Sequence, residues 1–70
     1  MISYQKLWVL LKERGITQSM LRREYGITPQ CISALKEDRY VRTALLDKLC
    51  LILSCDVSEI LERKEDAGEI

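Results

Sequence analysis

The sequence predicts a compact all-α domain of five helices. Apolar residues recur at intervals of three and four along most of the chain, and no run of alternating β-branched residues is long enough to predict a sheet. The 70 residues are 47% hydrophobic and include one proline and three glycines, a composition typical of a single globular domain. We expect that domain over residues 1–62 and a flexible tail over residues 63–70, where the apolar period is lost.

The first helix is expected over about residues 4–14. Gly15 follows it and can adopt the left-handed conformation that commonly ends a helix. The face predicted to be buried comprises Tyr4, Leu7, Trp8 and Leu11. Trp8 is therefore expected to be a core residue and not part of a ligand site.

Two short helices separated by a tight turn are expected over Gln18–Lys36. Thr17 can cap the second helix with its hydroxyl, and Gly26 ends that helix. Thr28 can cap the third helix, whose first residue is Pro29, a position where the missing N–H has no intrahelical partner. Two short helices joined so closely are typical of a helix-turn-helix.

A fourth helix is expected over residues 43–53, and a short fifth helix from Asp56. The fourth helix should bury Leu45, Leu46, Leu49, Cys50 and Leu53. Asp56 and Glu59 have the spacing of a capping box. The apolar residues expected to dock the fifth helix are Val57, Ile60 and Leu61.

The outward face of the third helix carries small and polar side chains. A helical wheel places Cys31, Ile32 and Leu35 on the inner side, and Pro29, Gln30, Ser33 and Ala34 on the outer side. Such a face suits the DNA major groove, because short side chains allow close approach, an amide can pair with adenine and a methyl group can contact thymine. A face that is only solvated is the alternative, but it would ordinarily carry more lysine and glutamate.

Positive charge gathers around the same helices. Residues 1–45 carry eight basic and four acidic side chains, whereas residues 46–70 carry three basic and seven acidic ones, although the whole chain is neutral. Each cation alone suits a solvated surface as well as a phosphate contact, and it is their grouping that favours DNA. The expected phosphate contacts are Thr17, Gln18, Arg22, Arg23, Pro29, Lys36, Arg39, Tyr40 and Arg42.

Several of these residues resemble a known family. Gly15-Ile16-Thr17-Gln18, Leu21, Gly26-Ile27-Thr28, Ile32 and Leu35 are similar to the Cro/C1-type (XRE family) helix-turn-helix. The resemblance implies a lambda-repressor-like fold and a small transcriptional regulator, expected to be a repressor, that binds double-stranded DNA as a homodimer. It also implies base contacts from Thr28, Gln30 and Ser33, with Cys31 and Ala34 as neighbours.

The sequence departs from this family at two places. Arg22 stands where the family usually has alanine, at the close crossing of helices two and three. The glycine that usually follows the reading helix is replaced by Glu37-Asp38-Arg39-Tyr40. Glu37 and Asp38 are expected to lie near the phosphates and to weaken binding unless they pair with Lys36, Arg39 or Arg42.

Other functions are less well supported by the residues. The chain has no histidine and no glycine-rich phosphate loop, so we expect no enzyme activity, no cofactor and no metal site. The cysteines form no C-x-x-C pair, and Cys31 and Cys50 are expected to be buried and reduced. A protein-interaction module, such as an antitoxin or an adaptor with the same fold, is the main alternative.

The surroundings of the domain can also be predicted. Leu51 and Ala44 lie off the core stripe of the fourth helix and could form a dimer interface, although single exposed apolar residues are common. No apolar run is long enough to span a bilayer, and charged residues interrupt the amino-terminal one, so we expect a cytoplasmic protein. A chain of 70 residues is not expected to include a separate domain for a small-molecule effector.

Overall fold

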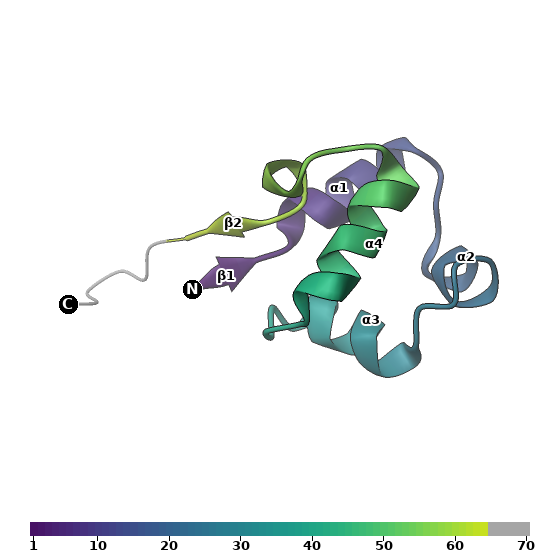
Figure 1. Ribbon diagram of the computed structural model, residues 1–70, viewed down its shortest axis with the longest axis horizontal. Helices are drawn as coiled ribbons and strands as arrows, with labels where there is room; N and C mark the ends of the chain where they lie inside the picture. Colours follow the sequence, from purple (N-terminus) through teal and green to yellow (C-terminus); the bar gives the residue numbers. More distant parts are fainter. Residues whose placement is uncertain (65–70) are drawn as a thin grey trace.

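The computed structural model describes residues 1–64, which form a compact helical domain (Figure 1). Two short strands, one near each end of these residues, pair with each other. In chain order the elements are β1 (Ile2–Ser3), α1 (Gln5–Glu13), α2 (Gln18–Arg23), α3 (Pro29–Lys36), α4 (Thr43–Leu53), the 3-10 turn η1 (Val57–Glu59) and β2 (Glu62–Arg63). The prediction of five α-helices is wrong by one within this part of the chain. The segment after Asp56 makes one 3-10 turn, because Ile60 leaves helical geometry at φ −122° and is fully buried.

The predicted caps of α2 and α3 are confirmed. The Thr17 hydroxyl accepts a hydrogen bond from the Met20 amide at 3.1 Å, and the Thr28 hydroxyl accepts one from the Cys31 amide at 3.2 Å. Pro29 occupies the first turn of α3, as expected. Each cap satisfies one amide that has no partner within its helix, so both helices begin where the sequence predicts.

Left-handed residues follow all four helices of the described chain. Gly15 at φ 69° and Gly26 at φ 68° were expected there, whereas Asp38 at φ 55° and Ser54 at φ 50° were not. After Gly15, Asp38 and Ser54, the amide of the following residue donates a hydrogen bond to the carbonyl five residues earlier. The donor and acceptor pairs are Ile16 to Leu11, Arg39 to Ala34, and Cys55 to Cys50, at 2.9–3.0 Å. This pattern satisfies carbonyls left open at the end of a helix.

Asp38 compensates for the glycine that is missing after α3. Its carboxylate accepts a hydrogen bond from the Tyr4 amide at 3.0 Å, just before α1, and the Tyr4 hydroxyl donates to the Arg39 carbonyl at 2.7 Å. Burial, the Asp38 carboxylate and Tyr40 raise the pKa of the Tyr4 phenol, which therefore remains a donor. Lys36, Arg39 and Arg42 were the possible partners considered for Asp38 from the sequence. The hydrogen bond from the Tyr4 amide shows a different role, in which the Asp38 carboxylate joins the end of α3 to the start of α1.

We expect Asp38→Ala to lower the free energy of unfolding by about 1–2 kcal/mol. Alanine would have to keep the left-handed conformation at this position, and the Tyr4 amide would lose the carboxylate that accepts its hydrogen bond. Asp38→Asn should cost much less, since asparagine tolerates this conformation and keeps an acceptor oxygen. Urea unfolding followed by Trp8 fluorescence compares the two variants. Equal losses of stability would contradict the role assigned to the Asp38 side chain.

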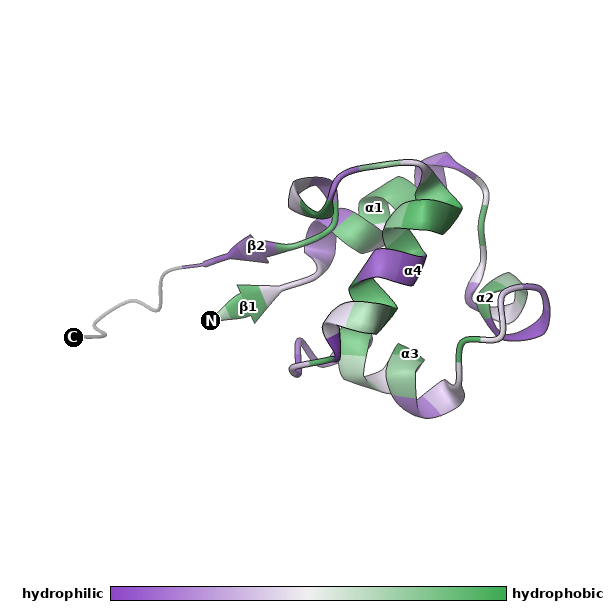
Figure 2. Ribbon diagram, viewed as in Figure 1, coloured by the Kyte–Doolittle hydropathy of each residue, from purple (hydrophilic) through white to green (hydrophobic). Residues whose placement is uncertain are grey.

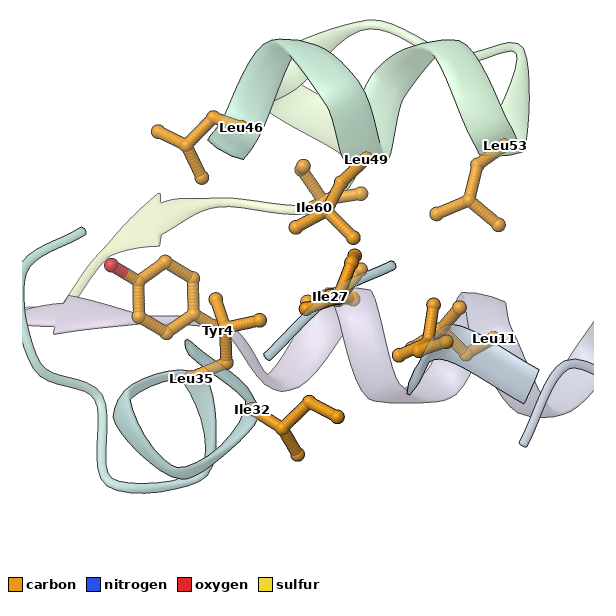
Figure 3. Close-up of a cluster of buried hydrophobic side chains, with 11 residues drawn as sticks. Tyr4, Leu11, Ile27, Ile32, Leu35, Leu46, Leu49, Leu53 and Ile60 are labelled. Carbon is orange, nitrogen blue, oxygen red and sulfur yellow. The ribbon is translucent and has the colours of Figure 1, made fainter. Parts of the chain in front are cut away.

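The core lies between α4 and the other helices. Leu46, Leu49 and Leu53 of α4 point toward Tyr4, Leu11 and Ile27 (Figure 3), and α4 is hydrophobic along most of its length (Figure 2). The buried apolar residues are Tyr4, Leu7, Leu11, Leu21, Ile27, Ile32, Leu35, Leu46, Leu49, Leu53 and Ile60. Trp8, Leu45 and Cys50 are half-buried and pack against this core. Val57 is 42% exposed, so the expectation that it docks the last helical segment is wrong.

The two ends of the described chain pair with each other. Ile2 lies opposite Arg63 and Ser3 opposite Glu62 in an antiparallel register, and the Lys64 amide donates to the Met1 carbonyl at 2.7 Å. Arg63 and Lys64, which were expected in a flexible tail, therefore belong to the folded domain. The rest of that predicted tail, residues 65–70, lies outside the described residues.

The segment between α4 and β2 is held by local hydrogen bonds. The predicted capping box is confirmed: the Asp56 amide donates to the Glu59 carboxylate at 2.8 Å, and Asp56 accepts from the Ser58 amide at 3.0 Å. These bonds from Ser58, including one from its hydroxyl, lower the pKa of Asp56. In residues 1–64 no helix combines the length and apolarity needed to cross a membrane.

Candidate nucleic-acid interface

The start of α3 forms an open polar surface beside α2. Ile32 and Leu35 are buried and fix one side of α3 against the core. Pro29 and Gln30, in the first turn, are exposed on the other side. The exposed position predicted for Gln30 from the helical period is therefore confirmed, and the Gln30 amide is free of the hydrophobic core.

The second half of the same face is less open than expected. Ser33 and Ala34 are half-buried, and the Ser33 hydroxyl donates to the Glu37 carboxylate at 3.0 Å. The other oxygen of Glu37 lies 3.2 Å from the Arg39 guanidinium. Ser33, Glu37 and Arg39 thus form a connected polar chain at the end of α3, in which Glu37 pairs with one of the three cations considered as its possible partners.

The remaining predicted base contacts differ in exposure. Thr28 is exposed, and because its hydroxyl accepts the Cys31 amide, its own proton is available to another acceptor. Cys31 is half-buried and packs against the core as a small apolar residue, with a free thiol. Thr28 and Gln30 are therefore the two members of the set that stand fully at the surface.

All nine predicted phosphate contacts are exposed on α2 and α3 or in the segments next to them. They are Thr17, Gln18, Arg22, Arg23, Pro29, Lys36, Arg39, Tyr40 and Arg42. Two other basic residues of the amino-terminal half serve the fold: the Lys6 ammonium donates to the Ser58 carbonyl at 2.8 Å, and Arg14 donates to the Leu53 carbonyl at 2.7 Å. Arg22, Arg23, Lys36 and Arg42 are exposed on or next to α2 and α3, Arg39 is exposed but paired with Glu37, and Lys12 is exposed on α1.

Lys48 is a further cation at this surface that was not predicted from the sequence. A Cβ atom added to Gly26, in the turn between α2 and α3, would lie 3.8 Å from the Lys48 ammonium nitrogen. Packing of α4 brings this residue to the turn from 22 positions further along the chain. No local sequence signal could have placed it there, because its position depends on tertiary packing.

The acidic carboxy-terminal segment lies away from the polar surface. In Figure 1, η1 and β2 are on the side of the domain opposite α2, and α3 lies below α4. Asp56, Glu59 and Glu62 belong to that segment. The segment that carries these three carboxylates is therefore separated in space from α2.

Comparison with known proteins agrees with this geometry. Residues 6–66 match the family described as the Cro/C1-type HTH DNA-binding domain. The chain belongs to this family. A crystal structure of the transcriptional regulator VanUg is similar to the Cro/C1-type domain described above, with 31% sequence identity and a TM-score of 0.84 over 93% of this chain and 87% of that one. No curated protein matches the chain.

Family membership confirms the helix-turn-helix assignment made from the sequence. The chain is a DNA-binding domain of the transcription-regulator class, a class whose members are typically not enzymes. Among residues 1–64, no three acidic or cysteine side chains are grouped so as to hold a metal ion. The individual base, phosphate and dimer contacts of this Cro/C1-type domain remain predictions.

We expect Glu37→Gln to tighten DNA binding by about two- to fivefold, because the change removes a negative charge near the expected phosphates and releases Arg39. Stability should change little, since both partners of the Glu37–Arg39 pair are more than half exposed and a carboxylate at the end of a helix is unfavourable. Fluorescence anisotropy with labelled duplex DNA measures the affinity. Glu13→Gln is the matched control, because it removes the same charge away from α3: Glu13 lines a hollow with Ser58 and Glu62. Equal effects of the two changes would contradict a local role for Glu37.

Proposed function

We propose that this domain is a sequence-specific repressor that inserts α3 into the major groove of double-stranded DNA. The observation that carries this proposal is the position of Gln30, which is exposed in the first turn of a helix anchored on its other side by Ile32 and Leu35. A rigid helix with a short polar side chain at its exposed start can approach base edges closely. A bound repressor would exclude other proteins from the same stretch of DNA.

The proposed base contacts centre on the first turn of α3. The Gln30 amide can form two hydrogen bonds with adenine, and the Thr28 hydroxyl can bond to a neighbouring base or phosphate. The Ser33 hydroxyl donates its proton to Glu37, so at a base edge the Ser33 oxygen would serve as an acceptor. Cys31 and Ala34 would contribute through contact with apolar parts of the bases.

The proposed phosphate contacts surround this turn. They are Thr17, Gln18, Arg22, Arg23, Pro29, Lys36, Arg39, Tyr40 and Arg42, and Lys48 joins them through its position beside Gly26. The Thr17 hydroxyl accepts from the Met20 amide and so keeps its proton for a phosphate oxygen. Contacts of this kind position the protein on DNA without reading sequence.

The proposed homodimer uses the side of α4 that faces away from the core. Leu51 is 80% exposed, and Ala44 is exposed two helical turns earlier on the same side. Sedimentation equilibrium should show a dimer for the unmodified chain and a monomer for Leu51→Asp, which places a charge in the interface. A monomer at tens of micromolar for the unmodified chain would remove this interface from the proposal.

Selection of bound sequences from randomised duplex DNA tests the function. We expect enrichment of an inverted repeat whose half-sites are about one helical turn apart. Transcription in vitro from a promoter that contains the selected site should fall when the protein is added. If the protein bound all sequences of the randomised pool equally, specific recognition would be contradicted. If transcription increased when the protein was added, repression would be contradicted.

A further inference from the structure

The end of α4 brings two cysteines together. Cys50 lies in the last turn, Ser54 is left-handed at φ 50°, and the Cys55 amide donates to the Cys50 carbonyl at 3.0 Å. This backbone hydrogen bond holds the two residues next to each other at the end of the helix. A disulfide requires such an approach, because it spans Cα atoms about 4.4–6.8 Å apart.

The end of α1 has the same backbone pattern, with aliphatic side chains at the two corresponding positions. There the Ile16 amide donates to the Leu11 carbonyl at 2.9 Å, Leu11 is buried in the core and Ile16 packs against the core. The two residues that flank such a bond commonly contact each other. At the end of α4 these two positions hold thiols in place of aliphatic side chains.

Both thiols can be reached from the surface. Cys50 and Cys55 are free and half-buried, and both line the same two shallow hollows, together with Asp47 and Asp56. The remaining cysteine, Cys31, is on α3 and lines neither hollow. The chain therefore has one neighbouring pair of cysteines and one separate cysteine.

We propose that Cys50 and Cys55 are a site of reversible oxidation, at which a low-molecular-weight disulfide such as oxidised glutathione converts the two thiols into an intramolecular disulfide. One cysteine thiolate attacks the glutathione disulfide, forms a mixed disulfide and releases one glutathione. The second cysteine thiolate then attacks the cysteine sulfur of the mixed disulfide and releases the second glutathione. Two protein thiols are oxidised, one glutathione disulfide is reduced, and the two thiol protons end on the two released glutathione molecules.

The reaction is expected to be slow at neutral pH. Burial raises the pKa of the Cys50 thiol, and Cys55, Asp56 and Asp47 raise it further. The protonated thiol is a poor nucleophile, so the equilibrium and not the rate is the informative quantity. This inference is independent of the proposed DNA contacts.

The test uses the full chain with Cys31→Ser, which keeps only the two neighbouring thiols. The protein is equilibrated without oxygen in glutathione buffers of increasing oxidised fraction at about pH 8, and free thiols are then alkylated. Cleavage after Lys48 and Arg63 gives one peptide that contains both cysteines. We expect this peptide to lose two hydrogen atoms and to become resistant to alkylation as the oxidised fraction rises.

Two controls make the result specific. Cys31→Ser combined with Cys55→Ser should be unable to lose the two hydrogens and should at most gain one glutathione. The unmodified chain should form the same bond as Cys31→Ser. The proposal would be overturned if both thiols could still be alkylated at every glutathione ratio, or if only glutathione adducts formed. Disulfides between chains, or a disulfide to Cys31 in the unmodified chain, would also overturn it.

Discussion

Raising the salt concentration from about 50 mM to about 200 mM is expected to weaken binding of this domain to duplex DNA by about 10³-fold, if a dimer makes six phosphate contacts. Each neutralised phosphate releases a condensed cation, so affinity falls steeply as salt rises. Arg22, Arg23, Lys36, Arg39 and Arg42 provide exposed cations for three such contacts from each subunit. Fluorescence anisotropy over a salt series gives the slope directly.

The same series separates DNA binding from the alternative of a protein-interaction module. The slope in question is that of the logarithm of the binding constant against the logarithm of the salt concentration. Arg42→Ala should reduce this slope by about one for each phosphate that is no longer neutralised, whereas Lys12→Ala, on α1, should leave it unchanged. A flat salt dependence would contradict the set of phosphate contacts. Tight binding to a protein partner that does not depend on salt would favour the interaction module.

Leu49→Ala should lower the free energy of unfolding by about 2–5 kcal/mol. The Leu49 side chain is fully buried and belongs to the hydrophobic core (Figure 3). Removing it reduces the apolar surface that folding buries and leaves a cavity, and a domain of this size has only about 5–15 kcal/mol of stability in total. Urea unfolding followed by Trp8 fluorescence measures the change.

Leu51→Ala is the matched control for this change. Leu51 is in the same helix and undergoes the same chemical substitution, but its side chain is 80% exposed. We expect its stability to change by less than about 0.5 kcal/mol at protein concentrations too low for dimers. Similar decreases in stability for the two variants would contradict the core described here.

The features predicted correctly from the sequence are those that neighbouring residues determine. Thr17 and Thr28 cap helices through hydroxyls that bond to amides three residues away, and Gly26 adopts a left-handed conformation in the turn. Such contacts depend on local spacing alone. The bounds of α3 and α4 could therefore be predicted before any tertiary contact was known.

The features that were missed depend on residues distant in the chain. β1 and β2 have two residues each, too few to show an alternating pattern, and they pair across about 60 positions. The left-handed Asp38 is held by the Tyr4 amide, 34 positions away. Neither contact has a signature in the residues around it.

The candidate site was predictable in part. The helical period placed Gln30 on the surface, but it also placed Ser33 on an open face, where Glu37 in fact covers its hydroxyl. Ser33 and Glu37 are four positions apart at the end of one helix, so their spacing was a usable signal for this contact. Lys48 could not be found in the same way, because only the packing of α4 brings it to Gly26.

The most direct test of the proposed reading helix is the affinity of Gln30→Ala for duplexes in which each base pair of a selected site is changed in turn. We predict a decrease of about 1–3 kcal/mol in discrimination at one base position, with preferences elsewhere retained. Arg39→Ala, measured on the same duplexes, should weaken all of them about equally. An unchanged sequence preference for Gln30→Ala would contradict recognition of DNA by the exposed start of α3.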